Sequence, residues 1–428
     1  MKRMLKYGLA RFLFLLAVFT IRKYEPGIIG VTGSVGKTSA KEAIGAVLKN
    51  IRRVRVSQES HNNEFGFPLA IIGEWRARDL ELVSTETVPG IKKIRKAVFW
   101  MKVAWKALYQ LVFVPRTVYP ELLILEYGAD RPGNLKYLIE MAKPQIAVVT
   151  AVGEIPVHVE FYEGREAVAR EKSRLVEGLP SNGFAVLNAD DNVVAAMRER
   201  TRAHVLTFGF SDAAEVRVTN FESRIHEGKP IGVSFKLEYG GSFVPVRIDG
   251  CFGKAVAYAA AASACIGIVF GMHLVRIAEG LAYFETPRHR MKVLPGLRGS
   301  WLIDDSYNAS PLSVASAIEA VRSLPASRKV AMLGDMLEIG EYTVEAHEAV
   351  GKRAVKVFDM IVTVGPRAKF IADAARNNGM PRRNLMSFET VEEAIPEAQN
   401  LIRRGDLVLI KASRGIRLDT LVEALRKA

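Results

Sequence analysis

The chain has 428 residues, of which 49% are hydrophobic and 25% are charged; this composition excludes a disordered chain and predicts two or three folded domains. The net charge of +14 suits a nucleic acid, an acidic membrane surface or a phosphorylated substrate, but no helix-turn-helix, zinc-finger or RNA-recognition pattern occurs, so we expect no nucleic acid. Two cysteines, Cys251 and Cys265, have no histidine beside them, which argues against a disulfide framework or a zinc site and favours a cytoplasmic protein.

Residues 1–24 form a basic and apolar N-terminal segment. Its uncharged run from Phe12 to Ile21 is shorter than the roughly 20 residues that a membrane-spanning helix needs. No small-residue cleavage site follows this run, so the segment lacks the form of a signal peptide. We interpret it as a helix that lies either on a membrane, through residues 1–22, or on the body of the protein.

From residue 27 onward, apolar runs typical of buried strands alternate with helical patterns. The expected strands of a first unit are 27–32, 122–126, 146–150 and 185–188, with helices at 37–50, 134–142 and 255–267 and antiparallel strands within 215–248. The pattern restarts near Pro287, with strands at 301–304, 329–333, 360–364 and 407–410. This alternation predicts an α/β fold: a central P-loop ATPase domain with a mostly parallel sheet over 25–286, and a C-terminal Rossmann-like α/β domain over 287–428.

A stretch at 97–114 is almost wholly apolar and follows a cluster of basic residues. Its polar residues recur every four positions, so on a helix they form one narrow polar stripe: Lys102, Lys106 and Gln110. Two interpretations stay open. The helix is either buried against its own domain or lies at a membrane interface, with lysines and arginines at the lipid head groups and tryptophans in the boundary layer.

A glycine-rich loop follows the first expected strand and opens the first expected helix. It consists of Gly33, Ser34, Val35, Gly36, Lys37 and Thr38. Backbone N–H groups of such a loop, at the positive end of a helix dipole, can bind nucleotide phosphates. The ammonium group of Lys37 can reach the transferred phosphate, and the hydroxyl of Thr38 can bind Mg²⁺. The loop predicts phosphate binding without specifying a reaction.

With Thr32 in front of it and no earlier glycine, this loop resembles the ATP loop of the Mur ligase family. Other segments resemble the branch of that family that adds D-alanyl-D-alanine: residues 62–69 (Asn-Asn-Glu-Phe-Gly-Phe-Pro-Leu), 126–129 (Glu-Tyr-Gly-Ala), 304–311 (Asp-Asp-Ser-Tyr-Asn-Ala-Ser-Pro), 333–340 (Leu-Gly-Asp-Met-Leu-Glu-Ile-Gly) and 411–415 (Lys-Ala-Ser-Arg-Gly). The resemblance extends from about Tyr24 to the C-terminus and is specific to these motifs.

The resemblance implies a ligase that activates a carboxylate as an acyl phosphate and then forms an amide. Its cofactors would be ATP and two Mg²⁺ ions, and its substrates a UDP-muramyl-peptide and D-alanyl-D-alanine. It implies catalytic roles for Lys37, Glu126, His158 and Lys172, metal binding by Thr38, Glu126 and His158, and carbamylation of Lys172. ATP would also contact Arg290, Asp305 and Asn308, with Tyr307 in the cleft between domains, and the substrate would contact Asn62, Asn63, Ser413 and Arg414.

Several of these residues have an ordinary structural alternative. Lys172 has charged neighbours and could be a solvated helix lysine, Asp305 could cap the next helix, and Asn62 and Asn63 could only shape a turn.

Three departures from the family qualify the expectation. Only residues 1–24 precede the ATP-binding domain, so we expect the family's N-terminal UDP-binding domain to be lacking. The apolar helix, about 91–114, is an insertion that would suit a substrate close to lipid. Ala259 stands where the family has an asparagine that reads adenine. The alternatives are a related ligase with a polyglutamate, pseudomurein or lipid-linked peptide acceptor, or a non-catalytic P-loop protein at the inner face of the membrane.

Overall fold

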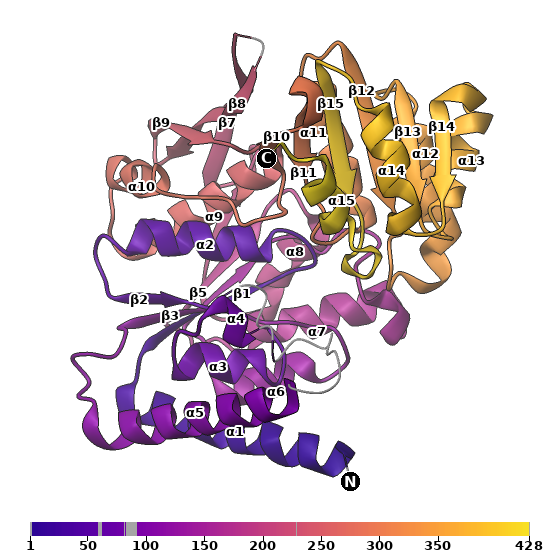
Figure 1. The fold of residues 1–428 in the computed structure, drawn as a ribbon. Coiled ribbons are helices and arrows are strands. Elements are labelled where there is room, and N and C mark those ends of the chain that lie inside the picture. Colours follow the sequence, from indigo (N-terminus) through magenta and orange to yellow (C-terminus); the bar gives the residue numbers. More distant parts are fainter. Residues whose placement is uncertain (1, 59–61, 81, 83–91, 228, 428) are drawn as a thin grey trace.

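The computed structural model describes residues 2–427 except 59–61, 81, 83–91 and 228. Within these residues the strands form two sheets (Figure 1). The first has nine strands in the order β2-β3-β1-β4-β5-β6-β7-β8-β9. Their bounds are β1 Gly27–Thr32, β2 Val54–Val56, β3 Leu122–Glu126, β4 Ile146–Val149, β5 Phe184–Asn188, β6 His204–Gly209, β7 Val216–His226, β8 Lys229–Tyr239 and β9 Ser242–Asp249.

The first seven strands in this order pair in parallel, and β7 to β9 are antiparallel. Side chains of the central strands alternate between two cores. Ile29 and Val31 pack with helices α2 (Lys37–Leu48) and α9 (Lys254–Val269), whereas Ile28 packs on the opposite side. That side is covered by α3 (Gly66–Ile72), α6 (Asn134–Met141) and α7 (Arg165–Glu177). Helices therefore cover both faces of the parallel strands, as the apolar runs predict.

The second sheet has the order β10-β11-β15-β12-β13-β14, and only β10 is antiparallel to its neighbour. Its strands are β10 Lys292–Pro295, β11 Trp301–Asp304, β12 Arg328–Gly334, β13 Met360–Val364, β14 Leu385–Phe388 and β15 Asp406–Lys411. Its helices are α11 Pro311–Arg322, α12 Thr343–Ala354, α13 Lys369–Asn377, α14 Val391–Leu401 and α15 Leu418–Leu425. The chain passes from the first sheet to the second between α10 (Leu274–Leu281) and β10, an interval that contains the boundary expected at 286–287. The predicted α/β fold, with its mostly parallel central sheet, is confirmed.

Helices α1 (Lys2–Tyr24) and α5 (Lys92–Phe113) form an outer layer beneath α3 (Figure 1). A separate small core joins Leu13 and Leu16 of α1 to Phe99 and Val103 of α5. The N-terminal segment thus lies on the protein body along one side. Two short helices, α4 (Ala77–Leu80) and α8 (Asn192–Ala195), lie elsewhere in the first half of the chain. Among the described residues, no helix is both long and apolar enough to cross a membrane.

The three residues of the polar stripe predicted on α5 differ in their exposure to water. Lys102 is exposed and pairs with Asp79, but Lys106 is partly buried and lies 4.6 Å from the centre of the Trp75 ring. The backbone carbonyl of Gln110 accepts hydrogen bonds from Lys23 and Tyr24 of α1. One face of α5 packs on α1 and α3, as expected for a helix buried against its own domain. The opposite face exposes apolar residues, so the expectation of a fully buried helix is wrong.

Candidate active site

The glycine-rich loop lies at the carboxyl end of β1, against the end of β4. Gly33 (φ 142°) and Gly36 (φ 88°) both have positive φ, which favours glycine. A Cβ on Gly33 would lie 2.2 Å from the hydroxyl oxygen of Thr150, so no other residue fits there without displacement. That hydroxyl donates to the carbonyl of Val35 at 2.6 Å. Thr150, at the end of β4, therefore fixes the conformation of the loop. Helix α2 begins at Lys37, directly after the loop, and a glycine loop at a helix N-terminus is a typical anion-binding site.

Two lysines converge on the carbonyl of Gly33. Lys37 donates to it at 2.9 Å and Lys172, from α7, at 3.2 Å. Lys172 is 2% exposed, so the alternative of a solvated helix lysine is wrong. Burial, together with the neighbouring charge of Lys37, lowers the pKa of Lys172 to about 7. A large fraction of this amine is therefore neutral near neutral pH, unlike an ordinary lysine.

Glu126 ends β3 in a fully buried position and faces the start of α2. One carboxylate oxygen accepts from the hydroxyl of Thr38 at 3.1 Å, and the other accepts from the side-chain amide of Asn62 at 3.1 Å. Lys41, one turn into α2, lies 3.9 Å from the same carboxylate and donates to the carbonyl of Ser57 at 2.5 Å. The adjacent hydroxyl and carboxylate oxygens are hard ligands of the kind that Mg²⁺ prefers, and they fit a metal that keeps most of its water or phosphate ligands.

His158 joins the two halves of the molecule. It has a left-handed backbone (φ 70°), and its Nε2 atom lies 3.3 Å from Asp130. Its Nδ1 atom lies 2.7 Å from the carboxylate of Glu338, which follows β12 of the second sheet. This contact lowers the pKa of Glu338. No group of three His, Cys, Asp or Glu side chains suited to a metal occurs in the described part of the chain.

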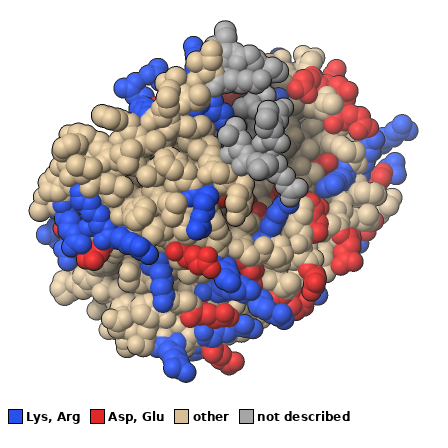
Figure 2. Space-filling view, turned by 90° about the horizontal axis from the view of Figure 1, so that it is seen from below, with Lys and Arg blue, Asp and Glu red and all other residues tan. Residues whose placement is uncertain are grey.

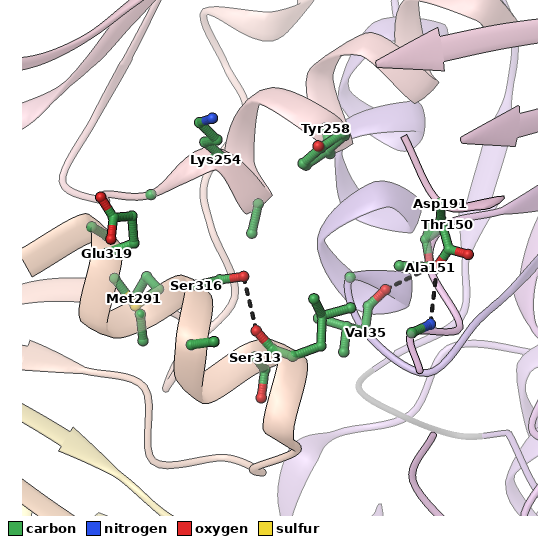
Figure 3. A pocket seen from close by; sticks show the side chains of 18 of the residues that line it. Val35, Thr150, Ala151, Asp191, Lys254, Tyr258, Met291, Ser313, Ser316 and Glu319 are labelled. Atoms are coloured by element: carbon green, nitrogen blue, oxygen red, sulfur yellow. Dashed lines mark hydrogen bonds between the residues drawn. The ribbon is translucent and has the colours of Figure 1, made fainter. Parts of the chain in front are cut away.

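A cleft of about 1190 Å³ lies between the loop and helix α11. Of the predicted ATP contacts, Val35, Gly36, Thr38, Arg290 and Asp305 line it. Figure 3 shows its walls: Val35, Thr150, Ala151 and Asp191 on one side, Ser313, Ser316 and Glu319 of α11 on another, and Lys254 and Tyr258 at the start of α9. Ala259 also lines it, next to Tyr258. The cleft is large enough for a nucleotide and is bounded by both sheets' helices.

Asp305 accepts a hydrogen bond from the backbone of Met291 at 3.2 Å and pairs with Lys411 of β15 at 2.6 Å. It does not cap α11, because Ser310 does so in a capping box with Ser313. Two guanidinium groups lie close to the centre of the Tyr307 ring, that of Arg290 at 4.2 Å and that of Arg414 at 5.2 Å. The structure thus brings Arg290 together with two of the predicted motifs, 304–311 and 411–415, at the carboxyl ends of β11 and β15.

Other predicted residues lie outside the cleft lining. The side chain of Asn63 accepts from the backbone of Phe65 and Gly66, so it shapes the turn before α3. The Asn308 carbonyl accepts from Lys411, and neither Asn308 nor Tyr307 lines the cleft as expected. Ser413 is buried and accepts from the backbone of Leu337. These positions connect the motifs to each other, and Ser413 does not line the cleft.

The roles of three residues of the site were not predicted from the sequence: Lys41, Lys411 and Tyr258. Lys41 and Lys411 are fully buried lysines beside Glu126 and Asp305, and burial lowers the pKa of both. Tyr258 donates to Asp190 at 2.7 Å on the cleft wall. A lysine at the end of an otherwise apolar strand, as at Lys411, is a pattern that could have been noticed.

Replacing Lys411 with methionine is expected to lower the free energy of unfolding by about 3 kcal/mol, because it leaves the buried carboxylate of Asp305 without its partner. A urea titration of wild type and variant measures the difference. Lys369→Met, which removes an exposed pair with Glu389, is the matched control and should leave the midpoint unchanged. A Lys411→Met midpoint equal to that of the control would show that the pair contributes nothing to stability.

The glycine loop on a parallel sheet, the buried Glu126 and the cleft shared with a second α/β sheet define a two-domain nucleotide-dependent enzyme. The Mur ligase middle domain matches residues 108–266, and the glutamate ligase domain of Mur ligases matches residues 289–414. The chain is 30% identical over 427 residues to the UDP-N-acetylmuramoyl-tripeptide–D-alanyl-D-alanine ligase of Mycobacterium leprae, covering 93% of this chain and 73% of that protein. The chain belongs to the Mur ligase family, in its MurF branch.

Two further comparisons agree. The corresponding ligase of Bacillus subtilis is 26% identical, over 96% of this chain and 78% of its own length. The crystal structure of MurF ligase from Thermotoga maritima in complex with ADP is 26% identical and superposes with a TM-score of 0.75, covering 97% of this chain and 83% of that one. MurF from Acinetobacter baumannii, at 23% identity and a TM-score of 0.75, shows the same fold. The expected family, fold and ADP-forming ligase class are confirmed.

Proposed function

We propose that this chain joins D-alanyl-D-alanine to a UDP-N-acetylmuramoyl-tripeptide at the expense of ATP. The observation that carries the proposal is the convergence of Lys37, Lys172 and the Thr38–Glu126 pair around one phosphate-binding loop. The names of the relatives supply the substrates. A reducing, ATP-containing compartment such as the cytoplasm suits the two free, buried cysteines.

ATP would lie with its phosphates on the loop and its nucleoside in the cleft beside α11. The carboxylate of Asp305 is suited to the ribose, with the guanidinium of Arg290 nearby. The aromatic ring of Tyr258 and the small Ala259 side chain would lie near the base. Thr38 and Glu126 would hold Mg²⁺, which shields the negative charge of the phosphates, and His158 would hold a second ion after release from Asp130 and Glu338.

In the reaction, a carboxylate oxygen of the tripeptide bonds to the γ-phosphorus of ATP, and the bond to the β-γ bridging oxygen breaks to release ADP. The amine of D-alanyl-D-alanine then attacks the acyl phosphate carbon, inorganic phosphate leaves, and the amine loses a proton. Lys37 would stabilise the charge that gathers on the transferred phosphate. Asn62, which holds Glu126, and Arg414 would face the peptide substrate.

We infer that Lys172 reacts with CO₂ to give a carbamate. The neutral amine attacks CO₂ and loses a proton, so a buried cation becomes an anion beside Lys37. The lowered pKa of Lys172, which follows first from burial and then from the charge of Lys37, favours this reaction. A carbamate could pair with Lys37 or hold a metal, which a lysine cannot do.

The test is mass spectrometry of products formed by the full chain with ATP, Mg²⁺ and UDP-N-acetylmuramoyl-tripeptide. We expect a product heavier by one D-alanyl-D-alanine residue pair when that dipeptide is supplied and none when L-glutamate is supplied instead. Extension of the product by glutamate would instead indicate a polyglutamate ligase. Folylpolyglutamate synthase from Mycobacterium tuberculosis shares the fold, at 16% identity and a TM-score of 0.64.

A further inference from the structure

The outer layer formed by α1 and α5 carries almost all of the excess positive charge of the chain. The two helices together contain twelve lysines and arginines and no aspartate or glutamate, whereas the whole chain has a net charge of +14. The remaining residues are therefore close to neutral. Such a concentration of one charge on two neighbouring helices predicts an anionic partner for this face.

The same face exposes large apolar side chains. On α5, Trp105 is 72% exposed, and it lies in one continuous helical stripe with Ile94, Val98, Met101 and Val112. Phe113 is 70% exposed at the end of the helix. On α1, the exposed apolar residues recur at helical spacing: Phe12, Leu15 and Phe19. Figure 2 views the molecule from the side of these helices and shows a broad area without charged side chains, with lysines and arginines at its margin.

The opposite side of α5 explains why this face is apolar. Phe99, Val103 and Ala107 pack in the small core against α1 and α3. Lys106 lies over the Trp75 ring and donates to the carbonyl of Glu74, so its charge is directed to the protein. A surface helix of a water-soluble protein buries its apolar face and exposes its polar face. Helix α5 differs, because it exposes apolar side chains in addition to those that it buries. Contiguous exposed apolar surface of this kind marks an interaction site.

We propose that α1 and α5 lie flat on an anionic lipid surface, with Trp105 and its stripe in the boundary layer and the exposed arginines of both helices at the head groups. Tryptophan, phenylalanine and tyrosine at an interface flanked by lysine and arginine fit a bilayer surface. Arg95 on α5 and Arg11 and Arg22 on α1 are exposed for head-group contact. The geometry is that of a helix in the membrane plane and needs no spanning segment.

A second copy of the chain fits this face less well. A symmetric dimer places the same patch of both subunits together, so the lysines and arginines of one copy would meet those of the other without any acidic residue on either pair of helices. An anionic membrane supplies the opposite charge over the whole area. The position also matters, because α3, which packs on both helices, directly follows the Asn62–Glu126 contact of the ligase site. Attachment would hold that site close to the lipid.

The experiment is sedimentation of the full chain with vesicles of phosphatidylcholine containing 30% phosphatidylglycerol, against vesicles of pure phosphatidylcholine, without substrates. We expect binding to the anionic vesicles. The double variant Trp105→Gln, Val112→Gln should lower the partition coefficient by at least about tenfold, because it removes buried apolar surface. Arg95→Gln should lower it by about fivefold on anionic vesicles only. The matched control, Phe243→Gln, changes a residue that is 61% exposed on β9 and should bind as wild type does.

Absence of binding by wild type to anionic vesicles, or equal binding by the Trp105→Gln, Val112→Gln variant, overturns the proposal. A wild-type dimer in analytical ultracentrifugation that the double variant converts to monomer, without vesicle binding by either, assigns the face to a second copy instead. Phosphate release in the absence of vesicles should be unchanged in the double variant. If the wild-type chain shows no ligase activity, the proposed reaction is contradicted. The vesicle-binding result still decides the proposed membrane contact, because that binding is measured without substrates.

Discussion

Replacing Lys37 with alanine should lower the rate of substrate-dependent phosphate release by about 10²–10³-fold, because one cationic donor to the transferred phosphate is lost. The protein should keep its fold, since the hydrogen bond that Lys37 makes within the described part of the chain goes to the carbonyl of Gly33 in its own loop. Release of phosphate from ATP-Mg²⁺ measures the effect.

The matched control for this variant is Lys49→Ala, at the other end of the same helix, where the side chain is exposed. It should retain wild-type activity. Lys37→Ala activity within a few-fold of the control would remove the loop from the reaction and leave it a structural turn.

Replacing Lys172 with alanine should lower activity by about a hundredfold, and small carboxylates such as acetate should restore part of it. The cavity left by the buried side chain lies beside Lys37, where a free carboxylate can take the place of the carbamate. Lys172→Arg should be inactive and not rescued, because a guanidinium group cannot react with CO₂ and fills the space. Initial rates with and without added acetate measure the effect.

The neutral amine needed for carbamate formation is plentiful because the pKa of Lys172 is about 7, whereas an ordinary lysine has less than about 0.1% neutral amine at that pH. At a fixed concentration of dissolved CO₂, wild-type activity should therefore fall as the pH drops below 7. Arg170→Ala, an exposed residue of the same helix, is the control. A Lys172→Ala variant as active as this control contradicts any role for a carbamate.

Much of the fold could be predicted because buried parallel strands are short apolar runs. Strand β1 and strand β3 have the expected bounds, and the antiparallel region at 215–248 resolves into β7 to β9. The strands that were not predicted are short or partly exposed, such as β2 with three residues and β14 at the sheet edge. The pairing of these strands depends on neighbours far away in the sequence, so no local sequence pattern predicts the strands.

The site was predicted in part for a similar reason. Loop residues that bind phosphate form a continuous motif, so Lys37 and Thr38 could be recognised in the sequence. Contacts between distant segments could not: the pairing of Lys411 with Asp305 spans 106 positions, and the contact of His158 with Glu338 joins the two domains. The exposed apolar side of α5 also escaped a unique prediction, because the sequence gives the polar stripe and not the direction in which it points.

The most direct test of the central claim is phosphate release from ATP-Mg²⁺ by the purified chain with UDP-N-acetylmuramoyl-tripeptide, with and without D-alanyl-D-alanine. Formation of an amide through an acyl phosphate predicts sustained release only when both substrates are present, and release slowed by about 10²–10³-fold in Lys37→Ala. Sustained release that is the same with and without the dipeptide, or no release although ATP binds, would contradict a D-alanyl-D-alanine ligase acting on this acceptor.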